Sequence, residues 1–166
     1  MGIANPVSSD HQLVRLLQMG IVLEEVVEVR ASKHYESLVS NDDVEPDPAV
    51  RALLSNAREE SAGHRRRLEE LIEELDAETV PFDRIQGLVE QRYTRAHPDS
   101  FDDVLYDQLH GEESAYKFYD DLLAAIEDSE TTFDVDQEHL VTTLAEIRDD
   151  EAAGVEEVTA LMTEEP

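Results

Sequence analysis

The stretch EESAYKFYDDL, residues 112–122, decides the fold that this sequence predicts. At helical spacing Glu112 falls on the same face as Ala115 and Tyr119, so a carboxylate lies within an apolar stripe. The same pattern occurs earlier in the chain as EVRASKHYESL, residues 28–38, where Glu28 opens the stripe. The repetition predicts a duplicated helical hairpin.

A second repeated motif supports the duplication. The segments REESAGH, residues 58–64, and DDEAAGV, residues 149–155, align an acid, a glutamate, an alanine and a glycine in the same register. Four glutamates of the two halves then face one interior: Glu28, Glu60, Glu112 and Glu151. Several carboxylates cannot remain as bare anions in a dry core, because each costs several kcal/mol to bury. The pattern predicts two metal ions between them, since carboxylates are hard oxygen ligands, unless the glutamates tip out to solvent.

The order of these motifs resembles the ferritin-like superfamily, and within it the rubrerythrin-related proteins. In that family each half supplies a Glu from one helix and a Glu-x-x-His from the next, and together they hold two metal ions in a bundle core. The resemblance covers roughly residues 10–163. It implies a homodimer or higher homo-oligomer and a site for two iron ions, or manganese.

The sequence departs from the family where its two ligand histidines should stand. Gly63 follows Glu60 and Gly154 follows Glu151 at those positions. Glycine inside a helix costs about 1 kcal/mol relative to alanine, so we expect both glycines to clear space for another group or a close helix contact. His64, one turn from Glu60, is the candidate substitute ligand.

Three further side chains are candidates to surround the site. Tyr35 and Tyr119 each lie seven residues after a stripe glutamate, two turns along the same helix face. They are expected to hydrogen-bond a ligand carboxylate of the other half, as in the family, or to be plain core aromatics. His34 occupies the Phe118 position of the repeat and is expected to pack beside the site.

The expected fold class is all-α, a ferritin-like four-helix bundle forming a single domain over residues 1–166. A first helical hairpin is expected over residues 10–76 and a second over residues 100–163. One long crossover, residues 77–99, connects them and contains a short extra helix. Helix caps are expected at Ser9, with Gln12 as its partner, and at Asp47, Ser100 and Asp136.

The composition sets limits on the function. The formal charge is −28, from 41 acidic and 13 basic residues, which is typical of adaptation to a salt-rich cytoplasm; a DNA-mimicking protein and a disordered acidic tail are alternatives. Such a surface should avoid nucleic acid and anionic membranes. The chain has no cysteine, so thiolate metal sites and the rubredoxin module of many rubrerythrins are absent. No membrane segment or leader is recognised, and a cytoplasmic location is expected.

The expected function is metal binding at the carboxylate-rich site. The resemblance implies iron or manganese binding, oxidation of the metal by oxygen or peroxide, and hence iron handling or peroxide defence with an electron donor or peroxide as partner. If it is an enzyme, it is an oxidoreductase of ferroxidase or peroxidase type. The alternative is a degenerate bundle without redox activity that has a structural or partner-binding role.

Overall fold

The computed structural model describes residues 6–40, 48–81 and 101–164. Four helices make up nearly all of these segments: α1 Asp10–Ser40, α2 Pro48–Leu75, α4 Phe101–Glu127 and α5 Gln137–Glu164. The described segments contain no strand, which confirms the all-α class. The extra helix and most of the crossover expected over residues 77–99, and the caps expected at positions 47 and 100, lie outside the described residues.

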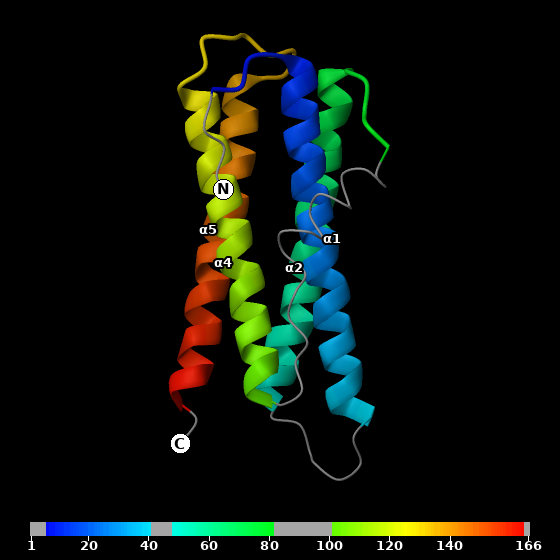
Figure 1. The fold of residues 1–166 in the computed structure, drawn as a ribbon, viewed down its shortest axis with the longest axis vertical. Coiled ribbons are helices and arrows are strands. Elements are labelled where there is room, and N and C mark those ends of the chain that lie inside the picture. The colour runs from blue at the N-terminus through cyan, green and yellow to red at the C-terminus, as the bar shows by residue number, and fades with distance from the viewer. Residues whose placement is uncertain (1–5, 41–47, 82–100, 165–166) are drawn as a thin grey trace.

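The helices form a four-helix bundle (Figure 1). Each helix packs against two neighbours: α1 against α2 and α4, and α5 against α4 and α2. In Figure 1, α2 and α4 run in one direction and α1 and α5 in the other, so neighbouring helices are antiparallel. The pair α1 and α4 therefore forms one face of the bundle, and the pair α2 and α5 forms the opposite face.

Side-chain caps fix the start of two helices where the sequence predicts them. At the start of α1, Ser9 Oγ accepts a hydrogen bond from the backbone N–H of Gln12 at 3.1 Å. At the start of α5, Asp136 Oδ1 accepts hydrogen bonds from the backbone N–H groups of Glu138 and His139, at 3.0 and 3.2 Å. Each bond satisfies a helix N–H that has no partner within its own helix.

The apolar core is divided into two clusters along the bundle. The first cluster lies towards the N-terminal end of α1 and includes Leu17, Leu68, Leu122 and Leu144. The second lies towards the C-terminal end of α1 and includes Leu54, Leu105 and Val158. Buried polar residues from all four helices lie between them along the sequence of each helix. The fold thus places a polar layer near the middle of a hydrophobic bundle.

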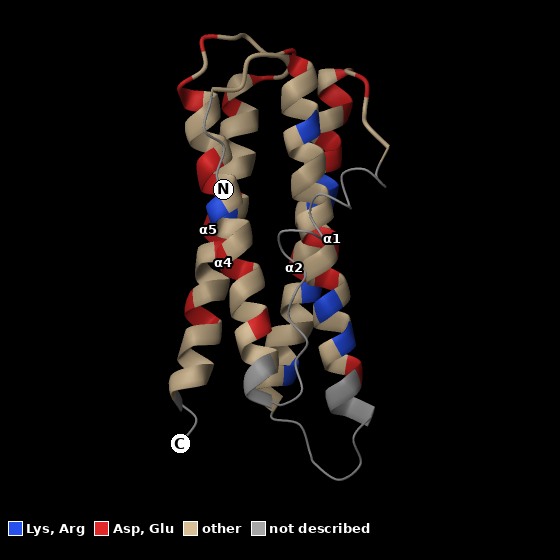
Figure 2. Ribbon diagram, viewed as in Figure 1, with Lys and Arg blue, Asp and Glu red and all other residues tan. Residues whose placement is uncertain are grey.

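Acidic and basic residues occur along the helices of the bundle (Figure 2). Among the described residues, the basic side chains lie mainly on α1 and α2, while α4 and α5 together carry Lys117 and Arg148. No helix in the described segments combines the length and apolar character that crossing a bilayer requires.

Candidate metal centre

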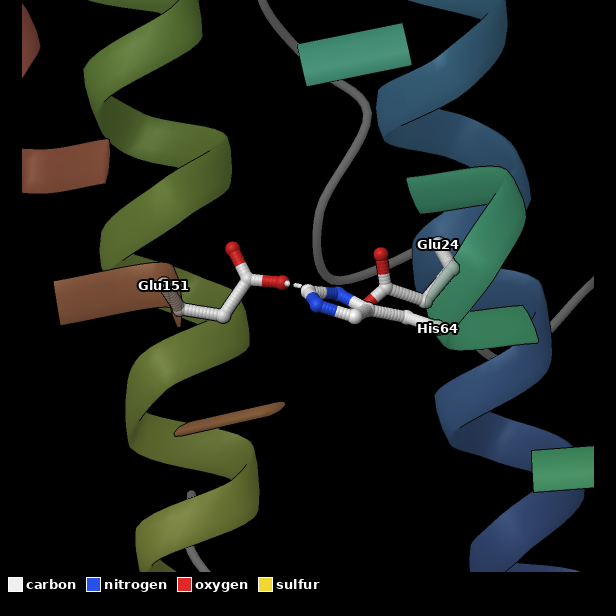
Figure 3. A group of neighbouring side chains, drawn as sticks. All are labelled: Glu24, His64 and Glu151. Atoms are coloured by element: carbon white, nitrogen blue, oxygen red, sulfur yellow. Dashed lines mark hydrogen bonds and ion pairs between the residues drawn. The ribbon is translucent and has the colours of Figure 1, made fainter. Parts of the chain in front are cut away.

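The polar layer brings together one ionisable side chain from each helix. Glu24 comes from α1, His64 from α2, Glu112 from α4 and Glu151 from α5, and they are respectively 0%, 3%, 4% and 2% exposed. Figure 3 shows Glu151 reaching from α5 towards the imidazole of His64, with Glu24 beside it. Charged groups this deeply buried are rare unless they are paired or bind an ion.

His64 is the centre of the contacts in this layer. Its Nδ1 atom lies 3.2 Å from Glu24 Oε1 and 3.2 Å from Glu151 Oε1. On the other side of the ring, Nε2 lies 2.8 Å from Oδ2 of Asp150, whose side chain is 48% exposed. The imidazole therefore links the buried glutamates to the solvent side of α5.

Two neutral side chains orient two of the carboxylates. The hydroxyl of Tyr119, which is fully buried, donates to Glu24 Oε1 at 2.8 Å. Gln108 Nε2 donates to Glu112 Oε1 at 3.0 Å. The second oxygens, Glu24 Oε2 and Glu112 Oε2, are buried and have no hydrogen-bond partner. Two unpartnered carboxylate oxygens fit a site that takes cations, since an unsatisfied buried acceptor is costly otherwise.

Burial and mutual repulsion raise the pKa values of three acidic groups in the layer, Glu60, Glu112 and Glu151. Burial, aided by the nearby Glu24 charge, raises the pKa values of Glu151 and Glu112. Burial also raises the pKa of Glu60 to about 7. Burial alone would lower the pKa of His64, but the hydrogen bonds and charges of Glu24 and Asp150 raise it to about 9. These shifts favour a cationic imidazole at His64 and retained protons on Glu60, Glu112 and Glu151.

The donor atoms form two groups that share one residue. Glu24, His64 and Glu151 each offer a ligand atom within 4.8 Å of the others, and so do Glu60, Glu112 and Glu151. Because Glu151 belongs to both groups, the two sets are adjacent. A third set on the α2/α5 face, of Glu60, His64 and Asp150, meets the same limit and is more exposed.

The structure brings four of the five sequence-predicted ligand candidates together: Glu60, Glu112, Glu151 and His64. It does not bring Glu28 to them. The Glu28 side chain is 25% exposed, and its Oε2 atom lies 2.8 Å from Nη1 of Arg65. Glu24, one turn earlier on the same helix stripe, takes the interior position.

The three residues expected to surround the site have different surroundings. Tyr119 contacts the site through Glu24, a carboxylate of the other half of the chain. The ring of Tyr35 instead lies beneath the guanidinium carbon of Arg58, 5.0 Å from its centroid. His34 lies away from the layer, where its Nε2 is 2.8 Å from Oδ2 of Asp107.

The two glycines differ in what they leave room for. A Cβ atom at Gly154 would lie 2.6 Å from Glu112 Oε2, so the missing side chain makes room for that carboxylate. A Cβ atom at Gly63 would meet nothing within 4 Å. Gly154 therefore lies directly against the Glu112 carboxylate, whereas Gly63 has open space beside it, and the role of the two glycines in the site stays a prediction.

Sequence reasoning missed three residues of this layer. Glu24 lies one helical turn before Glu28, and the sequence repeat favours Glu28 in its place. Gln108 precedes Glu112 by one helical turn, a spacing that allows the observed hydrogen bond. Asp150 is the neighbour of Glu151 and carries no sequence signal that separates it from other surface acids.

The chain matches no protein-family model, no curated protein and no solved structure. What the structure itself shows is a four-helix bundle with carboxylate and imidazole side chains gathered in its polar layer.

Proposed function

We propose that the bundle binds two metal ions in its polar layer, with iron or manganese as the occupants. The observation that carries this proposal is the pair of adjacent three-donor groups that share Glu151. Mostly carboxylate donors with one imidazole suit these metals better than the softer ones, which prefer thiolates.

The charge of the layer supports two ions. When ionised, Glu24, Glu60, Glu112 and Glu151 carry four negative charges in a region where three of them are buried. Two divalent ions supply four positive charges, and the unpartnered oxygens of Glu24 and Glu112 would be available to them as ligands. Metal binding would displace the protons that the metal-free layer retains.

The residues have unequal roles in this arrangement. Glu24 and His64 would hold the first ion, Glu60 and Glu112 the second, and Glu151 would bridge the two. Tyr119 holds Glu24 in place through its hydrogen bond, and Gln108 does the same for Glu112. Such outer partners fix the orientation of ligand carboxylates. Gly154 belongs to the site because it leaves room for the Glu112 carboxylate.

A redox-active metal pair would supply one-electron steps towards oxygen or peroxide, which is the activity of the ferritin-like proteins that the sequence resembles. The protein would then act in iron handling or peroxide defence. Its own residues would hold the ions in a water-poor layer, between two apolar clusters that limit solvent access.

A second candidate function has one observation in its favour. His64 as a cation already pairs with Glu24, Glu151 and Asp150. A polar layer satisfied in this way would suit a degenerate bundle with a structural or partner-binding role, in which buried ionic contacts set the packing register.

Metal analysis separates the two functions. Protein produced with iron and manganese supplied and purified without chelators should contain close to two ions per chain by elemental analysis. Titration of metal-free protein with Co²⁺ should show an absorption spectrum typical of oxygen and nitrogen ligands. The double variant Glu24→Ala with Glu112→Ala should bind neither ion. Wild-type protein with no metal above background would establish the structural role instead.

A further inference from the structure

The two adjacent donor groups of the polar layer differ in chemistry. The first group, of Glu24, His64 and Glu151, combines two carboxylates with an imidazole. The second group, of Glu60, Glu112 and Glu151, consists of carboxylates alone. Among the described residues, His64 is the one histidine found in any such group. An ion in the first group would therefore have a nitrogen ligand that an ion in the second group lacks.

We propose that the centre takes two different ions, Fe²⁺ in the group that contains His64 and Mn²⁺ in the group of carboxylates alone. This inference rests on the proposed metal-binding function and goes beyond it by assigning one metal to each group. Its basis is the ligand preference of the ions. Imidazole suits iron and zinc, whereas carboxylate and water oxygens suit manganese, which also binds most ligand sets more weakly than the other two.

The imidazole is oriented towards the first group. Its Nδ1 atom lies 3.2 Å from Oε1 of Glu24 and 3.2 Å from Oε1 of Glu151, the two other members of that group (Figure 3). Its Nε2 atom lies 2.8 Å from Oδ2 of Asp150. A carboxylate on one ring nitrogen is the arrangement that fixes the orientation of a metal-binding histidine. With Nε2 held by Asp150, Nδ1 is the nitrogen left for an ion.

The second group has a carboxylate where another imidazole would need room. A Cβ atom at Gly154 would lie 2.6 Å from Oε2 of Glu112, so that oxygen fills the place of a side chain one helical turn from Glu151. His34, the other buried histidine of the described segments, lies against Asp107 and belongs to neither group. The second group is therefore built from oxygen donors.

Each group also contains a buried oxygen without a partner. Glu24 Oε2 belongs to the first group and Glu112 Oε2 to the second, and neither has a hydrogen bond. These side chains are 0% and 4% exposed. An unsatisfied buried acceptor is costly, and each group has one that an ion would satisfy. Two such oxygens favour one ion in each group.

The surroundings of the two groups differ in the same sense. The side chains of the first group are all buried. Glu60 of the second group is half-buried, and a Cβ atom at Gly63, three residues further along α2, would meet nothing within 4 Å. This open position beside Glu60 leaves room for water, the other oxygen ligand that suits Mn²⁺.

Zn²⁺ serves as a diamagnetic substitute for iron in the test. Metal-free protein receives one equivalent of Zn²⁺ and an excess of Mn²⁺, and unbound ions are then removed. Native mass spectrometry should show chains with one ion of each metal as the main species. The electron spin echo signal of their Mn²⁺ should lack the nitrogen modulation that a Mn²⁺–imidazole complex gives in solution.

Three variants support this measurement. His64→Gln removes the nitrogen donor, so the preference of the first group for Zn²⁺ over Mn²⁺ should fall roughly tenfold or more in competition titrations. His34→Gln makes the same change at the other buried histidine, keeps a donor for Asp107, and should leave the preference unchanged. Glu60→Gln should weaken the binding of Mn²⁺ and leave the equivalent of Zn²⁺ bound.

The outcomes distinguish this inference from the metal function. Nitrogen modulation of Mn²⁺ in the mixed protein would overturn the assignment and leave the two-metal centre standing. A mixture of two-zinc and two-manganese chains without the mixed species would do the same. Both results come from wild-type protein, so the test does not depend on the folding of His64→Gln. Absence of bound metal from wild type would overturn the assignment and the metal function together.

Discussion

Replacing Glu24 by glutamine should stabilise the metal-free protein and weaken its response to metal. The side chain is fully buried among other acids, and its Oε2 atom has no hydrogen-bond partner. An unsatisfied buried polar atom costs about 1–3 kcal/mol. In Glu24→Gln an amide group can donate a hydrogen bond from that position, and one negative charge is removed beside Glu151, which belongs to the same donor group.

The opposing term is the lost ion pair with His64, and the geometry indicates that it is smaller. His64 keeps Asp150 at 2.8 Å and Glu151 at 3.2 Å, so its charge is not left alone. The amide oxygen can still accept the hydrogen bond from Tyr119. We therefore expect a net stabilisation of about 1–3 kcal/mol in the metal-free state, and each kcal/mol raises the Tm of a chain of this size by about 2–4 °C.

Bound metal should make wild type more stable than Glu24→Gln, the reverse of the order expected without metal. An ion present at 100 times its Kd stabilises the folded state by about 2.7 kcal/mol for each site. Wild type should gain this for both ions, whereas Glu24→Gln should lose the gain from the ion held with His64. Urea unfolding with a chelator, and again with Mn²⁺ or Co²⁺, measures both differences.

Glu28→Gln is the matched control on the same helix. Glu28 is 25% exposed and pairs with Arg65, so its replacement should change stability by less than ~1 kcal/mol, with or without metal. If Glu24→Gln instead loses ~3–5 kcal/mol without metal, the size expected for a broken buried ion pair, Glu24 is a structural counter-ion of His64 and the reasoning is refuted. Loss of the metal response in Glu28→Gln would equally refute the assignment of Glu24 to the site.

Three further predictions follow from the same structure. Gly154→Ala should destabilise the protein by about 1–3 kcal/mol, because its Cβ would overlap Glu112, whereas Gly63→Ala should stabilise it by ~0.5–1 kcal/mol through helix propensity; thermal melts of both variants compare them. Stability of the metal-free protein should fall as the pH rises from about 4.5 to 9. The folded state retains protons on Glu60, with pKa about 7, and on His64, with pKa about 9, whereas the unfolded state releases them at 4.5 and 6.5. Urea unfolding at several pH values in molar salt tests the sign. The Tm should rise as salt increases from 0.1 to 1 M, since screening lengths fall from ~10 to ~3 Å, and a Tm independent of salt would contradict adaptation to high salt.

The helices could be predicted from the sequence because their signals are local. Apolar stripes at helical spacing placed all four helices, and the capping residues Ser9 and Asp136 marked two of their starts. A helix of this length begins and ends where its own residues allow, so few distant contacts are needed to locate it.

Two acids of the polar layer could be predicted as well. Glu112 and Glu151 are the acids of their stripes that the repeat selects, and both are buried in the layer. A glycine in a helix interior needs a packing reason, and at Gly154 the Glu112 carboxylate lies where a side chain would begin. The open space beside Gly63 could not be predicted, since a half-buried helix position can remain open to one side without cost to its neighbours.

The choice between Glu24 and Glu28 shows why the first half could not be settled. The two residues are one turn apart on the same helix face, about 6 Å along the axis, and the periodicity admits both. What selects Glu24 is the stagger of α1 against its neighbours, which places His64 of α2 and Tyr119 of α4 at the level of Glu24. The stagger also leaves Arg65 at the level of Glu28, where an ion pair holds that carboxylate at the surface.

The sequence repeat assumes that both halves share one register, but the interior is asymmetric. The repeat position equivalent to Glu24 is Gln108, an amide that donates a hydrogen bond to Glu112. In the proposed site the two halves of the chain would therefore contribute differently: the first would supply Glu24 and His64 to one ion and Glu60 to the other, and the second would supply Glu112 and the shared Glu151.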